Sequence, residues 1–190
     1  MKNIFMVLVC LVVSFSFSAQ ASREKDSHEH GAANVMLAME GEKLQLNFEV
    51  PSESLIGFEH FPKSQDQRWY FNEAIKSLLE PSKLFSIPAD AECLLVGINV
   101  SQSLFSAEDE HGHDEKDKHG HDESDKSEIH SEFISKYHWN CEHLDEIDSI
   151  GTQLMNIFPR IEEIRVRWIT KNNQGSIELE SKDDRIKGWK

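Results

Sequence analysis

The chain predicts an α+β fold of two related sub-halves, each an antiparallel sheet packed by a helix, joined by a disordered His/Asp/Glu-rich loop. Three observations predict it. Apolar and polar residues alternate along several short segments, and two longer segments have helical periodicity. Between them, residues 106–128 contain Ala107 as their only hydrophobic residue, so this loop cannot contribute to a core. The expected order is β-β-α-β in sub-half 28–104 and β-α-β-β in sub-half 129–181.

The first half begins with a predicted β-hairpin. Apolar residues alternate with polar or small ones along 35–39 and again along 44–50, with Gly41 in the turn between them. Pro51 ends the second strand, and we expect Ser52 to cap a short helical turn after it.

A helix is expected over residues 65–80, before Pro81. The segment that follows, 93–100, is expected to be a strand whose apolar residues share one face. The residues of that face are Leu94, Val96, Ile98 and Val100.

The second half begins with a strand over 130–141, whose inward and outward residues alternate. Its inward residues are Phe133, Ser135, Tyr137, Trp139 and Cys141. A helix is expected over 145–157, a strand over 161–170 and a last strand over 176–181. Three tryptophans on apolar stripes are expected in the core: Trp69, Trp139 and Trp168.

Residues 1–21 have the features of a cleavable export signal. They contain Lys2, an apolar stretch over 4–13 that is too short to span a bilayer, and an A-x-A cleavage site at 19–21. The mature chain is therefore expected to be a single domain over 22–190, and the bacterial periplasm fits this signal best. No later segment predicts insertion into a membrane.

The composition is strongly acidic. The formal net charge is −14, and removal of Lys2 with the signal makes it one unit more negative. Such a charge disfavours binding to nucleic acid or to anionic membranes and favours cations.

Two cysteines remain in the mature chain, Cys93 and Cys141. In an oxidising compartment such a pair is expected to form a disulfide. We expect this disulfide to close the base of the His-rich loop. The alternative, that both thiols bind metal, is less favoured because thiolate ligands usually occur as C-x-x-C pairs.

The His-rich loop contains a tandem repeat. Residues 111–126 are HGHDEKDKHGHDESDK, in which H-G-H-D occurs twice with carboxylates around it. Imidazole suits zinc, copper and nickel, and the carboxylates raise the local concentration of cations. The four candidate ligands are His111, His113, His119 and His121. The alternative is an acidic linker that happens to contain histidine.

The remaining histidines suggest a second site in the folded part of the chain. It would combine His28 or His30 with His60 or Glu59 and one histidine of the strand after the loop. His130 and His138 are eight residues, or about 26 Å of strand, apart and so cannot bind the same ion. His130 is preferred because it lies at the end of the strand next to the loop. His138 and His143 are expected to be surface residues.

Several segments carry a resemblance to one family. They are H-E-H-G at 28–31, E-V-P-S-E-S-L-I-G-F-E-H at 49–60, A-E-C at 91–93, H-S-E-F-I-S-K-Y-H-W-N-C at 130–141 and I-F-P-R-I-E-E-I-R-V at 157–166. On these residues the chain resembles the ZrgA family, zinc-regulated periplasmic proteins of Gram-negative bacteria.

The resemblance implies periplasmic Zn²⁺ binding that assists a high-affinity zinc ABC importer, whose solute-binding component would be the partner. By matching position, the folded domain would supply metal ligands, and the four loop histidines would supply others. The folded-domain candidates are His28, His30, Glu59, His60 and His130.

Three other functions remain open at this stage. The first is a copper or nickel buffer, because these ions bind nitrogen ligands at least as tightly as zinc does. The second is a zinc-dependent hydrolase with Glu59 as the base, which the absence of H-E-x-x-H disfavours, so no enzyme is expected. The third is an interaction module whose acidic loop binds a basic partner.

Overall fold

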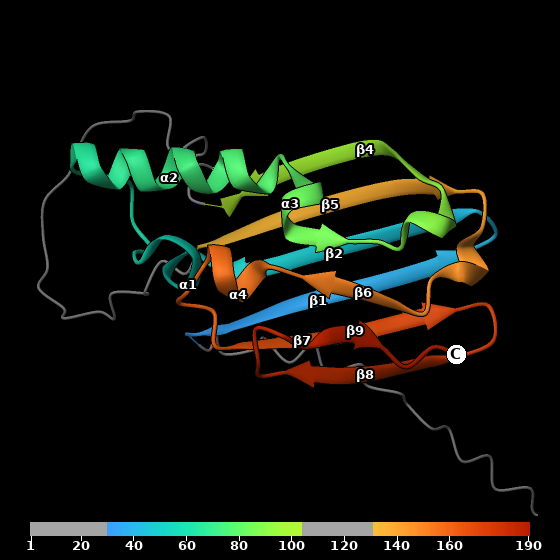
Figure 1. Cartoon of the computed structure of the whole chain (residues 1–190). Helices are drawn as coiled ribbons and strands as arrows, with labels where there is room; N and C mark the ends of the chain where they lie inside the picture. The colour runs from blue at the N-terminus through green and yellow to red at the C-terminus, as the bar shows by residue number, and fades with distance from the viewer. Residues whose placement is uncertain (1–29, 104–130) are drawn as a thin grey trace, which may run out of the picture.

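The computed structural model describes residues 30–103 and 131–190 (Figure 1). The predicted signal over 1–21 and the predicted loop over 106–128 lie outside the described residues. The α+β class predicted from the sequence is confirmed, since a mixed sheet and a small antiparallel sheet are combined with a few helices.

The principal element is a six-stranded sheet with the order β4-β5-β2-β1-β7-β8. Its strands are β1 (Ala32–Glu40), β2 (Lys43–Pro51), β4 (Cys93–Gln102), β5 (Glu132–Cys141), β7 (Glu163–Thr170) and β8 (Gln174–Leu179). The predicted hairpin at the start of the chain is confirmed as β1 and β2, and Gly41 in its turn has a φ of 62°, in the left-handed region that favours glycine.

Strands from both predicted halves pair within this one sheet. β5 pairs with β2 and β4, which come from the first half, and β1 pairs with β7 of the second half. The β1–β7 pair is parallel, with Ala32 opposite Glu163 and Met39 opposite Thr170. The two segments on either side of the loop therefore share one layer of structure.

One face of the sheet bears the hydrophobic core, because residues alternate between its two faces along each strand. A three-stranded sheet of β3 (Phe85–Ser86), β6 (Ser149–Thr152) and β9 (Arg185–Lys187), in the order β3-β6-β9, lies over this face (Figure 1). Its buried residues Phe85, Ile150 and Ile186 belong to the same core as Tyr137 and Phe48 of the large sheet.

Within the described residues, four α-helices complete the layer on that face: α1 (Ser52–Ile56), α2 (Gln65–Leu78), α3 (Pro81–Leu84) and α4 (Leu154–Ile157). Ser64 starts α2 with a capping box, in which its hydroxyl accepts from the Gln67 N–H at 3.1 Å. The prediction that Ser52 caps α1 is wrong. It is the first residue of that helix and is fully buried, while its N–H donates to the Ser131 carbonyl at 2.8 Å.

The tryptophan prediction is correct for two of three residues. Trp139 and Trp168 are buried, and the Trp168 ring meets Trp189 edge to face with centroids 6.2 Å apart. Trp69 is 58% exposed, so its assignment to the core is wrong. Only Ala74 and Leu78 of α2 are buried, which makes the buried stripe of this helix narrower than its sequence suggests.

The predicted strand over 93–100 is confirmed as β4, but most of its apolar residues are exposed. β4 is an edge strand, and its pairing with β5 has a bulge between Leu95 and Gly97. Leu94 is 70% exposed, and Val96 and Ile98 are exposed as well. Alternation identified the strand, but no element of the described structure covers this part of it.

The predicted helix over 145–157 is replaced by three shorter elements. A 3₁₀ turn over Leu144–Glu146 is followed by β6 and then by α4. β6 pairs with β3 and β9, which come from distant parts of the chain. The spacing of the apolar residues in this segment fits a helix as well as short elements, and the pairing partners decide between them.

The sheet has two distinct ends, which we name by what lies there. Residues 104–130 connect β4 to β5 at one end of the sheet, which we call the loop end. At this end β2 and β4 stop, and β1, β5 and β7 start. The opposite end holds the Cys93–Cys141 disulfide, which confirms the predicted pairing, and we call it the disulfide end.

The position of the disulfide corrects one prediction. Cys93 and Cys141 face each other where β4 begins and β5 ends, whereas Gln102 and Phe133 face each other next to the loop. The disulfide is therefore about 30 Å from the base of the loop, at about 3.3 Å per residue of strand. Instead, backbone pairing closes that base, together with a bond from the Glu132 N–H to Ser103 Oγ at 2.9 Å.

Candidate metal centre

His30 and Glu59 come together at the loop end. His30 immediately precedes β1, and Glu59 follows α1. The His30 Nε2 lies 3.8 Å from Glu59 Oε1, and the two side chains are 59% and 18% exposed. An imidazole nitrogen and a carboxylate oxygen at this separation supply two of the four ligands of a typical zinc site.

The backbone around His30 is held by hydrogen bonds. The Gly31 N–H donates to Ser54 Oγ of α1 at 2.9 Å, and the Gly31 carbonyl accepts from the N–H groups of Glu162 and Glu163. The start of β1 is therefore fixed to α1 on one side and to β7 on the other. This explains why His30 lies beside the segment that follows α1.

A turn and a buried ring position Glu59 and His60. α1 ends at Gly57, whose φ of 86° lies in the left-handed region. The next residue, Phe58, is buried, and its ring stacks on the His60 ring with centroids 5.2 Å apart. The His60 Nδ1 lies 2.8 Å from the Phe61 carbonyl, which can only accept. A neutral His60 therefore carries its proton on Nδ1 and keeps the Nε2 lone pair for a metal.

The remaining predicted ligands have different positions. Over residues 30–103 and 131–190, His60 does not form a three-ligand group with His30 and Glu59 in which all ligand atoms lie within 4.8 Å of one another. The other six predicted ligands lie outside the described residues: His28, His111, His113, His119, His121 and His130. Ser131, which follows His130, is bonded to Ser52 at the loop end.

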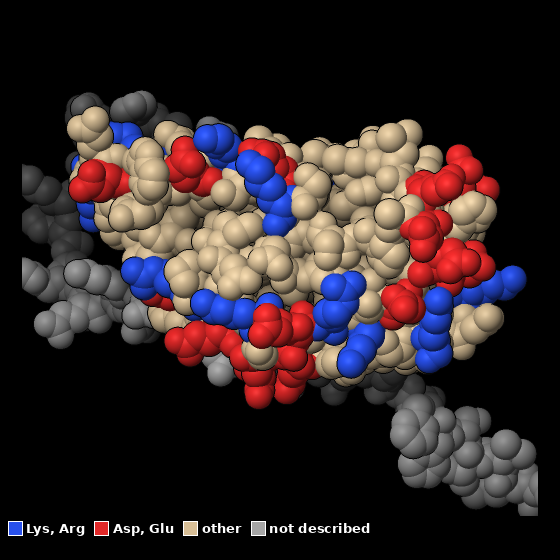
Figure 2. Space-filling model, viewed as in Figure 1, with Lys and Arg blue, Asp and Glu red and all other residues tan. Residues whose placement is uncertain are grey.

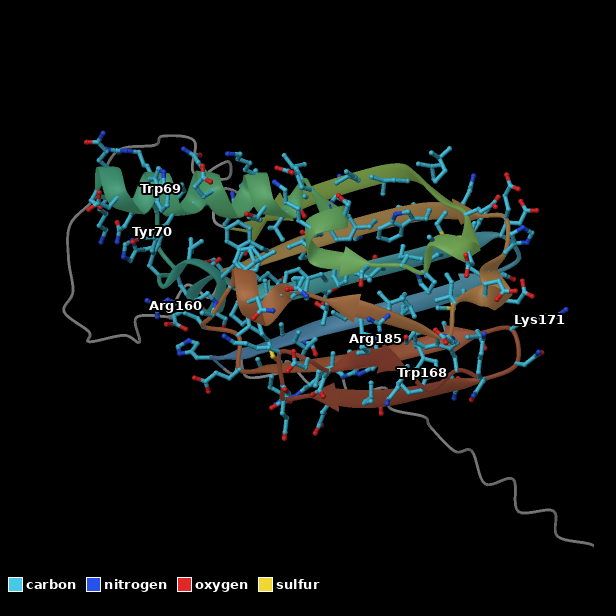
Figure 3. The ribbon with its side chains drawn as sticks, viewed as in Figure 1. Trp69, Tyr70, Arg160, Trp168, Lys171 and Arg185 are labelled. Carbon is cyan, nitrogen blue, oxygen red and sulfur yellow. A yellow bond between two sulfur atoms is a disulfide. The ribbon has the colours of Figure 1, made fainter. Side chains whose placement is uncertain are left out.

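A groove lies next to this end, between α2 and residues 157–160, with a cavity volume of about 400 Å³. Trp69 and Tyr70 of α2 line it with Arg160, and Figure 3 shows these three side chains at the same end of the molecule. The exposed Trp69 ring thus forms part of a surface groove.

A second group of metal-ligand side chains lies at the disulfide end. Glu92, Glu142 and His143 are all exposed, and each offers a ligand atom within 4.8 Å of the other two. Glu92 lies between the 3₁₀ turn Ala89–Ala91 and β4, while Glu142 and His143 follow β5 directly. The sequence reasoning placed His143 on the surface, which is correct, but missed this group.

The sequence did contain a signal for this group. Glu92 precedes Cys93, while Glu142 and His143 follow Cys141. Once the disulfide is expected, antiparallel pairing places the residue before one cysteine near the residues after the other. His138 differs from His143, because it lies within β5, where its ring is close to Gly97.

Comparison with known proteins identifies the family. The sequence model that describes the ZrgA family zinc uptake protein matches residues 27–188. The chain belongs to the ZrgA family. The match includes both the His30–Glu59 pair and the Glu92, Glu142 and His143 group. No curated protein matches the chain.

Membership of the ZrgA family connects the chain with zinc uptake and with zinc as its metal. The family is one of uptake proteins, not of enzymes. In residues 30–103 and 131–190, no helix has both the length and the apolar character needed to cross a membrane.

Proposed function

We propose that this ZrgA-family chain is a periplasmic zinc-binding protein that scavenges Zn²⁺ and assists its delivery to a high-affinity zinc ABC importer. Zinc uptake is the function of the family. The structural observation that supports a scavenger is the position of the loop. Both of its stems join the sheet at the end where His30 and Glu59 meet.

In this proposal the loop and the folded domain have different tasks. His111, His113, His119 and His121 capture Zn²⁺ from dilute solution. Because a loop loses conformational freedom when it wraps an ion, its sites are weaker than preformed ones and release the ion faster. His30 and Glu59, supplemented by ligands among His28, His60 and His130, hold an ion at the base of the loop.

The features of an export signal in residues 1–21 support a location in the periplasm. We propose that residues 1–21 are removed on export and that the mature protein begins at Ser22 in the periplasm. The receiving partner is the solute-binding component of the importer, and zinc is the cargo, so no catalytic step is proposed.

Binding through histidine makes the proposal dependent on pH. Only neutral imidazole binds zinc, and an ordinary histidine is about tenfold less available at pH 5.5 than at pH 7.5. Zinc affinity should therefore fall about tenfold for each histidine ligand over this interval. Equal affinity at the two pH values would exclude histidine as the ligand.

The experiment that tests the proposal is calorimetric titration of zinc into the mature chain and into a variant without residues 107–126. The full chain should bind two or more ions, and the deletion should retain at least one tight site. If the deletion binds none, the folded-domain ligands are wrong. Tighter binding of copper or nickel than the Irving–Williams order predicts for nitrogen ligands would instead support a buffer for those metals.

A further inference from the structure

Glu92, Glu142 and His143 make up the metal-ligand group at the disulfide end that the proposed function does not use. Their ligand atoms all lie within 4.8 Å of one another. A tetrahedral zinc ion with bonds of about 2.0–2.2 Å separates its ligand atoms by about 3.3–3.6 Å. All three side chains are exposed, so rotation of their side-chain torsions can close the difference without moving the backbone.

The identity of the ligands favours zinc over the alkaline-earth ions. One imidazole nitrogen with two carboxylate oxygens is a mixed set that zinc accepts, whereas calcium and magnesium take oxygen ligands. With three protein ligands, the fourth position remains for water. Such a site differs from a group of carboxylates alone because His143 contributes a nitrogen ligand.

The covalent structure fixes the three residues relative to one another. Glu92 is bonded to Cys93, Glu142 is bonded to Cys141, and the Cα atoms of the two cysteines are 3.9 Å apart across the disulfide. In addition, the His143 N–H donates to the Ala91 carbonyl at 3.1 Å. The segments before β4 and after β5 are therefore joined by a covalent bond and by backbone hydrogen bonds.

The charge around the group also favours a cation. Figure 2 shows acidic side chains gathered at one end of the molecule. Besides the group itself, exposed acidic residues at the disulfide end include Glu40, Glu42, Asp90, Asp145, Glu146 and Asp148. Lys171 and Lys190, which line a cavity with Glu142, offset part of this charge. The excess of carboxylates raises the local concentration of divalent cations.

We propose that Glu92, Glu142 and His143 form a second Zn²⁺ site of the folded domain, separate from the loop end and positioned by the Cys93–Cys141 disulfide. The inference depends on the proposed function in one respect, namely that zinc is the ion the protein handles. The two sites are separated by about the length of β5, or about 30 Å.

The test uses the full mature chain with point substitutions. Zinc bound per chain is measured by equilibrium dialysis at pH 7.5 for wild type, His143→Ala and Glu142→Gln. Both variants should bind one ion fewer than wild type. The matched controls are His138→Ala, which removes a histidine within β5, and Glu40→Gln, which removes a carboxylate of the same end outside the group. Both controls should bind as many ions as wild type.

A second chain isolates the site. In a variant with alanine at His28, His30, His60, His130 and the four loop histidines, one zinc ion should still bind. NMR should show that addition of zinc shifts the His143 ring signals and leaves the His138 ring signals in place. If this chain binds no zinc while wild type does, the inference is wrong and the scavenger proposal stands. If wild type binds none, both fail.

The positioning role of the disulfide has its own readout. In the Cys93→Ser, Cys141→Ser variant, the zinc concentration needed to shift the His143 signals should rise at least tenfold, while the zinc affinity of the loop end is unchanged. An unchanged His143 response would show that the disulfide does not position the site. Should this variant fail to fold, the His143→Ala and Glu142→Gln comparison still decides the inference.

Discussion

The loop end and the disulfide end of the same sheet hold potential zinc ligands in different ways. At the disulfide end a covalent bond joins the segments that carry Glu92, Glu142 and His143. At the loop end, hydrogen bonds fix Gly31 next to His30, and Glu59 lies 3.8 Å from the His30 ring without a covalent link. The contrast suggests that the first arrangement keeps a fixed geometry, and that the second can accept ligands from a connected segment.

The largest expected effect comes from removing the disulfide. By the chain-entropy model, a bond across 48 residues stabilises the fold by about 4 kcal/mol, so the Cys93→Ser, Cys141→Ser variant should lose about that much unfolding free energy in urea. Loop-end zinc binding should persist in the folded variant. If the folded variant no longer binds zinc at the loop end, the two ends of the sheet do not bind zinc independently.

The next effect concerns Tyr137, which lies midway along β5 and is fully buried. Burial raises the pKa of Tyr137 from 10 to about 12, against a smaller opposing effect of the Ser135 side chain. The folded protein thus holds this proton more tightly than the unfolded chain. The stability that results is complete below pH 10 and is lost as pH rises through 12, a change of about 2–3 kcal/mol.

Urea unfolding at intervals between pH 9 and pH 12 measures this loss. Tyr137→Phe should abolish the part of the pH dependence of the unfolding free energy that comes from this residue. It also removes the hydrogen bond that the Tyr137 hydroxyl donates to the Leu78 carbonyl at 2.8 Å. Tyr70→Phe, which changes the other tyrosine, should retain the pH dependence of the wild-type protein. If the unfolding free energy depends on pH equally in the two variants, Tyr137 is not the group that causes the loss of stability.

A smaller effect is expected at the loop end. In the chain without residues 107–126, His30→Ala should weaken the remaining loop-end zinc site at least tenfold, or about 1.4 kcal/mol. The unfolding free energy should change by less than about 0.5 kcal/mol because the side chain is largely exposed. Calorimetry provides the first value and urea unfolding the second. His138→Ala is the matched control, and an equal loss of affinity there would remove His30 from the site.

The smallest effect is expected for Trp69. Because its ring lies on the surface, Trp69→Ala should change the unfolding free energy by less than about 0.5 kcal/mol. Trp168→Ala, which removes a buried ring, should cost about 3–5 kcal/mol. A large loss for Trp69→Ala would show that α2 packs more tightly than its exposure indicates.

The sequence predicted those parts of the fold that depend on local pattern. Alternation identified β1, β2, β5 and β7, since each buries one face against the core. It could not show that β4 lies at the edge of the sheet, because exposure of Leu94 depends on what covers the strand. Likewise, Ile150 belongs to a strand because β3 and β9 pair with it, which local spacing does not determine.

For the candidate site, too, the sequence indicated the residues with a local signal and missed those brought together by strand pairing. The sequence indicates His30 and Glu59 because they flank the first hairpin and match segments of the family, and the structure places them 3.8 Å apart. The Glu92, Glu142 and His143 group was missed because each residue alone is an ordinary surface residue. Their proximity arises from the disulfide register, which pairs segments 48 residues apart.

The hydrogen bond between Glu132 and Ser103 has a consequence for how the number of metal ligands in such a chain can change in evolution. Since the strand pair is already closed at that point, residues inserted beyond it disturb no part of the core. Each doubling of the insert costs only about 0.6 kcal/mol of closure entropy. Under the proposed function, duplication of the H-G-H-D unit therefore adds zinc ligands in small genetic steps, while the sheet stays the same.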